Sequence, residues 1–144
     1  MKIEIVKQIA ASVVMISSAY ATESLTIEQA QKIFFNQAIR FEEATVKLSS
    51  DQINLIREIS GVRQRNSEQK FWRAYSKDKF LGWVLIDDVI GKHENITYAT
   101  AVSVEGEVLG VEILTYRETH GHEVKRKDWR DKLKGKKLAD PFKL

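Results

Sequence analysis

The chain has 144 residues, of which 43% are hydrophobic and 30% charged, and it contains no cysteine. A chain of this length and apolar content builds one domain around its own core, which excludes an intrinsically disordered protein. The lack of cysteine excludes disulfides, cysteine-ligated zinc and iron–sulfur clusters, and 23 basic against 20 acidic residues leave a net charge of +3.

Residues 1–21 have the features of an export signal. Lys2 and Lys7 precede a modestly apolar run at 9–17, and Ala19-Tyr20-Ala21 fits the small-residue pattern of a cleavage site. The apolar run is shorter than the roughly 20 residues that cross a bilayer. The sequence therefore predicts cleavage near Ala21 and a periplasmic or exported mature protein. A retained N-terminal helix or anchor is the alternative.

Residues 22–61 are predicted to be helical. Thr26 and Gln29 have the spacing of a capping box, and Ser49 and Gln52 repeat it. After the first box, apolar residues recur at three- and four-residue spacing, which predicts one amphipathic helix: Ile27, Ala30, Ile33, Phe34, Ala38, Phe41 and Leu48. A shorter apolar stripe follows the second box, at Ile53, Ile56 and Ile59, and Gly61 is placed to end that helix. We expect both stripes to pack into the core.

The middle of the chain changes to β structure. Alternating and apolar runs predict strands at 71–75, 80–86, 96–104 and 108–116, the last two joined by a tight turn at Glu105-Gly106. A short helix is expected at 128–133. Helices, then a run of strands, then a helix predict an α+β fold, with N-terminal helices packed on a mainly antiparallel sheet.

The densest group of polar side chains follows the last predicted strand, over residues 116–123. Loops at strand ends often carry binding sites. A zinc or copper site would take its ligands from His120, His122, Glu118, Glu123 and His93. A site for a planar anionic cofactor would take its donors from Arg117, Thr119 and the backbone N–H groups around Gly121. A solvated polar loop is the third interpretation, and the residues alone leave all three open.

The C-terminal part of the chain is basic between Lys125 and Lys137, but Asp128, Asp131 and Asp140 interrupt or follow the run. Nucleic-acid interfaces concentrate positive charge on one surface. The mixed signs, together with the predicted export, favour a solvated helix face and no nucleic-acid partner.

Six short motifs between residues 61 and 137 occur in an order and spacing that are specific as a set. They are Gly91-Lys92-His93-Glu94, Ile96-Thr97-Tyr98-Ala99, Val104-Glu105-Gly106, Tyr116-Arg117-Glu118, Gly121 and Trp129. With them the chain resembles the FMN-binding domain family. That family includes the periplasm-facing flavin subunits of sodium-pumping NADH:quinone reductase and Rnf complexes, and the chain is most similar to its small stand-alone exported members. Residues 62–144 would be this domain.

The resemblance implies an FMN-binding electron-transfer protein of the periplasm or the membrane face, with a membrane redox partner and a flavin transferase as partners. The cofactor site that it implies comprises His93, Thr97, Tyr98, Arg117, Glu118, Thr119, Gly121 and Trp129. In that site Trp129 or Tyr98 would contact the ring, Thr119 and Gly121 would donate to ring carbonyls, and Arg117 and His93 would stabilise negative charge. Trp129 as a core anchor of the last helix is the alternative.

One family feature is missing from the sequence. Family members usually carry a Ser-Gly-Ala-Thr motif whose threonine is esterified to the FMN phosphate, and the Ala-Thr pairs at 21–22, 44–45 and 99–100 all lack the preceding Ser-Gly. We therefore expect a domain that is incomplete at its C-terminal end, one that binds FMN without a covalent bond, or one that has lost flavin. A non-redox exported module that docks a protein partner, or a His/Glu metal-binding protein, remains the alternative function.

Overall fold

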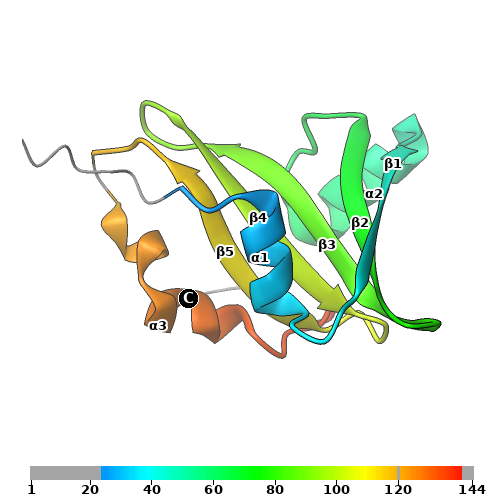
Figure 1. The fold of residues 1–144 in the computed structure, drawn as a ribbon. Coiled ribbons are helices and arrows are strands. Elements are labelled where there is room, and N and C mark those ends of the chain that lie inside the picture. The colour runs from blue at the N-terminus through cyan, green and yellow to red at the C-terminus, as the bar shows by residue number, and fades with distance from the viewer. Residues whose placement is uncertain (1–23, 120, 141–144) are drawn as a thin grey trace, which may run out of the picture.

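The computed structural model describes residues 24–119 and 121–140, so the predicted export signal lies outside the described residues. Helices and strands alternate at first and then give way to a run of strands (Figure 1): α1 (Ile27–Phe34), β1 (Arg40–Lys47), α2 (Ser50–Ser60), β2 (Glu68–Ser76), β3 (Lys79–Ile90), β4 (Asn95–Ser103), β5 (Val108–Tyr116) and α3 (Lys127–Arg130). Two short 3-10 helices, η1 (His122–Lys125) and η2 (Asp131–Leu133), flank α3. None of the described helices has the length and apolar character needed to cross a membrane.

The strands form one five-stranded sheet in the order β1-β2-β3-β4-β5, and every neighbouring pair is antiparallel. This meander confirms the predicted α+β fold with a mainly antiparallel sheet and a short C-terminal helix. The tight turn expected at Glu105-Gly106 is present, with Gly106 at a φ of 78°. Its N–H donates to the Ser103 carbonyl at 2.9 Å, which closes the connection between β4 and β5.

The core lies between α1 and one face of the sheet. Its fully or nearly buried side chains come from α1, the residue after it, and β2 to β5: Ala30, Phe35, Trp72, Ala74, Val84, Ala99, Ala101 and Leu114. The predicted capping box fixes the start of α1, because Gln29 N–H donates to Thr26 Oγ1 at 3.2 Å and Thr26 N–H donates to Gln29 Oε1 at 2.8 Å. The small, fully buried side chains of Ala99 and Ala101 in β4 let the short helix approach this strand closely.

The prediction of one helix from Ile27 to Leu48 was wrong beyond Phe34. Residues 40–47 form β1 and pair with β2 over their whole length, from Arg40 opposite Tyr75 to Lys47 opposite Glu68. The three- and four-residue spacing of the apolar residues is real, but pairing with β2 satisfies the backbone of this segment instead. Tertiary context of this kind overrides helix propensity, which is a weak preference. The segment 22–61 is therefore not wholly helical.

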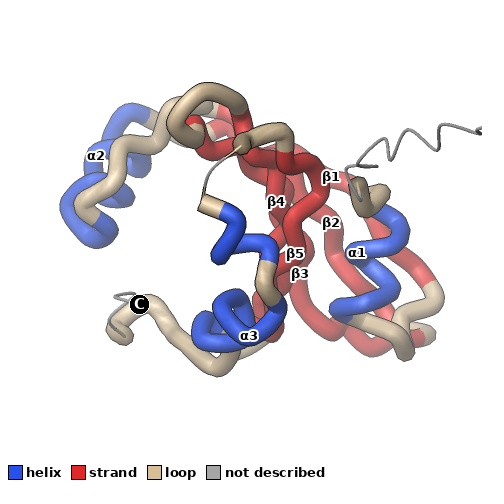
Figure 2. The backbone as a smooth tube through the Cα atoms, turned by 90° about the vertical axis from the view of Figure 1, so that its left-hand side faces the viewer, coloured by secondary structure: helices blue, strands red, loops and turns tan. Residues whose placement is uncertain are grey.

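The second predicted helix forms, but it does not pack as expected. Ser49 and Gln52 make the capping box, and Gly61 ends α2 in a left-handed conformation with a φ of 71°. No residue of α2 is buried, and Leu55 and Ile59 are each 53% exposed. Figure 2 shows the reason: α2 projects from the sheet on the side opposite α1.

The two edges of the sheet differ. At the β5 edge the C-terminal segment adds backbone pairing, because Val108 N–H donates to Lys136 O and Gly135 N–H donates to Val108 O, both at 2.8 Å. At the other edge β1 exposes most of its side chains, among them Arg40 and Glu42, which form an ion pair at 3.0 Å.

Candidate functional site

The sheet face that α1 leaves uncovered lies between α2 on one side and α3 on the other (Figure 2), and the cavities described next form a groove on it. Two adjoining cavities form it, one of about 610 Å³ and one of about 320 Å³. Val89 and Tyr98 line both cavities, so the two spaces meet at these residues. We name them the polar cavity and the apolar cavity after the side chains described next.

The apolar cavity has a floor of strand side chains and a wall from the C-terminal segment. It is lined by Val89, Ile96, Tyr98, Thr100, Val108, Val111, Ile113, Val124, Trp129 and Leu133. Side chains two residues apart in a strand share one face, and the floor therefore alternates with the core alanines on the other face. The structure thus brings two of the predicted site residues, Tyr98 and Trp129, to a single apolar space.

Arg130 holds the wall of the apolar cavity against the sheet. Its Nε donates to the Val111 carbonyl at 2.9 Å and its Nη2 contacts Glu112 Oε2 at 3.0 Å. Both side chains of this ion pair are largely buried, with 12% and 17% of their surface exposed. Since Trp129 precedes Arg130 in α3, the anchored arginine also fixes where the tryptophan lies.

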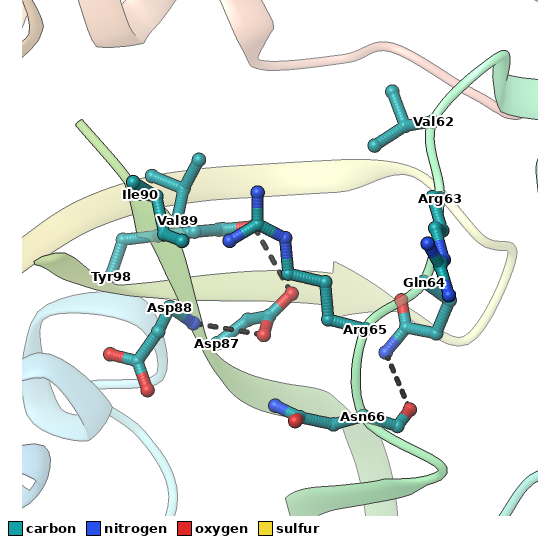
Figure 3. Close-up of a pocket in the computed structure, with 10 residues that line it drawn as sticks. All are labelled: Val62, Arg63, Gln64, Arg65, Asn66, Asp87, Asp88, Val89, Ile90 and Tyr98. Carbon is teal, nitrogen blue, oxygen red and sulfur yellow. Dashed lines mark hydrogen bonds between the residues drawn. The ribbon is translucent and has the colours of Figure 1, made fainter. Parts of the chain in front are cut away.

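The polar cavity lies between the loop after α2 and the end of β3 (Figure 3). The loop contributes Arg63, Gln64, Arg65 and Asn66, and β3 contributes Asp87 and Asp88 beside Val89 and Ile90. Gln64 Nε2 donates to the Asn66 carbonyl at 3.2 Å, which stabilises the bend of the loop. Figure 3 shows Arg65 extending from the loop across the cavity toward β3.

Tyr98 stands where the two cavities meet. Its hydroxyl donates to Asp87 Oδ2 at 3.4 Å, a long hydrogen bond. Burial, and then the negative charge of Asp87, raise the pKa of Tyr98 to about 12. The phenol is therefore neutral at physiological pH and keeps its proton for hydrogen bonding. Thr97, the preceding residue, donates its hydroxyl to Asp88 Oδ1 at 2.5 Å and lines neither cavity.

Glu118 joins two of the motifs that carry the family resemblance. Its side chain is buried, and Oε1 accepts from the backbone N–H groups of His93 at 2.5 Å and Glu94 at 2.8 Å. Gly91 closes the same turn by donating its N–H to the Glu94 carbonyl at 2.9 Å. The carboxylate thus holds the turn between β3 and β4 against the segment that follows β5. Among the described residues, Oε1 of Glu118 therefore accepts hydrogen bonds from backbone N–H groups.

The other predicted site residues lie near this junction but line neither cavity. His93, Arg117, Thr119 and Gly121 are all exposed. Gly121 has a φ of 72° and precedes η1, which brings the ring of His122 to 5.8 Å from the buried ring of Tyr116. The structure therefore gathers Tyr98 and Trp129 at the groove and leaves these four residues outside its lining.

The metal interpretation finds no support in the part of the chain that the structure describes. No group of three or more histidine, aspartate or glutamate side chains there is arranged to hold a metal ion. His120, which that interpretation requires, lies outside the described residues.

The arginines of the polar cavity were not predicted as site residues from the sequence. Arg63 and Arg65 stand two residues apart in a polar run directly after Gly61, and neither was assigned a role from the sequence. A guanidinium group can bind anions such as phosphate, but only the fold shows that the loop carrying these two arginines borders a cavity.

The chemistry of the groove fits the group that the family resemblance implies. An apolar cavity bordered by two aromatic side chains suits a flat ring system, and an adjoining cavity with two guanidinium groups and two carboxylates suits a polar, anionic tail. Comparison of the chain with models of known protein families, with curated proteins and with solved structures finds no match.

Proposed function

We propose that this chain is an exported FMN-binding electron-transfer protein that works in the periplasm or at the membrane face. The observation that carries the proposal is the apolar cavity of about 320 Å³ in which Tyr98 and Trp129 lie together. A cofactor site of this kind is concave, largely apolar and provided with a few polar groups. The order and spacing of the family motifs support the same assignment.

In this proposal the residues of the chain position the cofactor and control its surroundings. Trp129 and Tyr98 border the ring, and the aliphatic side chains around them exclude water. The neutral Tyr98 hydroxyl adds a hydrogen-bond group at the polar end. Bound FMN would supply the redox chemistry by accepting and passing on one or two electrons, while the protein sets its environment.

The segments that Glu118 joins follow β3 and β5 and lie outside the lining of both cavities. The turn bearing His93 is held to the segment bearing Arg117, so the side chains of His93 and Arg117 belong to the same end of the sheet. We propose that they stabilise negative charge at that end. A membrane redox partner and a flavin transferase are the partners that the proposal implies, and FMN would be held by this chain without a covalent bond.

Calorimetric titration of the chain with FMN tests the proposal. We expect saturable binding that Trp129→Leu weakens by about tenfold, because aromatic contacts with a flat ring contribute on the order of 1 kcal/mol or more. Trp83→Leu is the matched control, since Trp83 lies on β3 outside both cavities. Failure of the intact chain to bind FMN, or equal loss in both variants, would contradict the proposal.

A non-redox module that docks a protein partner is the second candidate. One observation favours it: α2 buries no side chain and leaves Leu55, Ile59 and the following Val62 more than half exposed. A folded, colourless protein that binds no flavin would favour this function over the first.

A further inference from the structure

The polar cavity contains a pair of arginines that ring binding does not require. We propose that this cavity binds a phosphate monoester, with Arg63 and Arg65 as its cationic ligands, and that it holds the phosphorylated tail of the ligand whose ring lies beside Trp129. The inference rests on the proposed function, because the ring fixes which end of the ligand reaches the polar cavity. It assigns these two residues and the orientation of the ligand along the groove.

The position of the cavity is the first argument. Val89 and Tyr98 line both spaces, so the two cavities adjoin at these side chains, and we propose that one ligand extends past them from one cavity into the other. The polar cavity is the larger of the two, at about 610 Å³ against 320 Å³. A flat ring alone would leave it empty, whereas a ring with a polar chain attached would extend into it.

The second argument is that the charges of the two arginines are not used in ion pairs among the described residues. Among the residues that the structure describes, neither Arg63 nor Arg65 takes part in an ion pair, whereas Arg40, Arg126 and Arg130 each do. Both side chains belong to a loop, where they can adjust to a ligand without disturbing the sheet. A guanidinium group presents a planar fork of donors that matches phosphate oxygens in pairs, with charge-assisted hydrogen bonds.

The carboxylates of the cavity narrow the class of ligand. Asp87 accepts from the Tyr98 hydroxyl and from the Asp88 N–H, and Asp88 accepts from Thr97, so both are held on β3 (Figure 3). Carboxylates repel a bare anion but accept hydrogen bonds from hydroxyl groups. A cavity with arginines on its loop and carboxylates on its strand therefore favours a hydroxylated chain that ends in phosphate over inorganic phosphate alone.

Calorimetric titrations with FMN, riboflavin and inorganic phosphate test the inference, because FMN and riboflavin differ by the phosphate only. We expect the wild-type chain to bind FMN about tenfold or more tightly than riboflavin, since one charge-assisted contact is worth at least that factor. Inorganic phosphate should bind more weakly than FMN. The double variant Arg63→Gln/Arg65→Gln should lose the preference for FMN and bind riboflavin as the wild type does.

The control is Lys47→Gln/Arg57→Gln, which removes the same charge from exposed positions outside both cavities and should keep the preference. All four arginine and lysine side chains are exposed, so circular dichroism should report folded variants. Equal binding of FMN and riboflavin to the wild type, or a preference that survives in the arginine variant, overturns the inference and leaves the proposed function intact. Absence of binding by both flavins overturns the proposed function and the inference together.

Discussion

The carboxylate of Glu118 occupies the space that a side chain at position 91 would need. A Cβ placed on Gly91 would lie 2.3 Å from Glu118 Oε1, far closer than non-bonded atoms approach. The same oxygen accepts two backbone N–H groups of the turn. Glycine at 91 and glutamate at 118 therefore depend on each other, although 27 positions separate them in the chain.

Gly91→Ala should therefore destabilise the fold by about 1–3 kcal/mol, because the methyl group displaces a buried carboxylate from its hydrogen bonds. Urea unfolding of the single and double variants measures the effect. In a Glu118→Ala background, Gly91→Ala should lower the free energy of unfolding much less, because the carboxylate with which the methyl group clashes is absent. Equal costs in the two backgrounds would contradict the dependence.

Arg130→Ala should cost more than an ordinary surface substitution. Removing one partner of a buried ion pair leaves the other charge uncompensated, which costs about 3–5 kcal/mol in fully buried cases. Glu112 keeps slight exposure, so we expect about 2–4 kcal/mol by chemical denaturation. FMN affinity should fall as well, because α3 forms the wall that carries Trp129.

Arg126→Ala is the matched control for that experiment. Its ion pair with Asp128 leaves about two-thirds of each side chain exposed, and such pairs contribute 1 kcal/mol or less. If Arg130→Ala lowers the free energy of unfolding no more than Arg126→Ala does, the buried ion pair does not anchor α3.

Stability should fall in alkali through Tyr98. Its pKa is raised to about 12 in the folded chain, above the value of 10 in the unfolded chain, so its contribution is complete below pH 10. As the pH rises toward 12 this contribution is lost. The free energy of unfolding should fall by about 2 kcal/mol or less, because the ring is partly exposed. Comparing urea unfolding of wild type and Tyr98→Phe from pH 9 to 12 measures it. Parallel pH curves would contradict the assignment.

The two capping boxes should differ in their effect on global stability. Thr26→Ala should cost about 1 kcal/mol, because the helix that it caps covers the core. Ser49→Ala should change the global unfolding free energy much less, since α2 buries no residue and can open locally. Thermal unfolding gives the first comparison. Hydrogen exchange should show faster exchange in α2 than in α1, and the opposite order would overturn the prediction.

Co-expression with a flavin transferase should leave this chain without covalent flavin. No threonine in the chain follows Ser-Gly-Ala, so the transferase lacks its acceptor, and any bound FMN should leave when the fold is lost. A denaturing gel under ultraviolet light and the intact mass provide the test. A fluorescent band heavier than the apoprotein by one FMN less water would point to a different acceptor, such as Thr119.

Local sequence signals predicted the parts of the fold that depend on near neighbours. Both capping boxes, the Gly61 helix end and the Gly106 turn follow from residues within a few positions of each other. The strands of the meander were found because alternation is a local pattern, but their ends were set too short at β2 and β3. Sheet pairing between distant segments extends a strand beyond its own apolar run.

The features that were not predicted from the sequence depend on contacts between residues that lie far apart in the chain. β1 looks helical by itself and becomes a strand because β2 lies beside it. The groove could be predicted only in part: Tyr98 and Trp129 came from the family motifs, whereas Arg63 and Arg65 became relevant once the loop was placed across from β3. The packing of Glu118 against Gly91 could not be predicted for the same reason, because these residues become neighbours only in the folded sheet.

The contrast between the two edges of the sheet has a consequence for assembly. Backbone pairing by residues 135 and 136 occupies the β5 edge at Val108, whereas among the described residues no strand pairs with the outer edge of β1. That strand carries Arg40, Glu42 and Glu43, with ion pairs to Glu42 and Lys70 running along it. Charges on an open edge discourage association between sheets. An apolar strand that added to the sheet beside β1 would therefore have to bury unlike charges that are already paired.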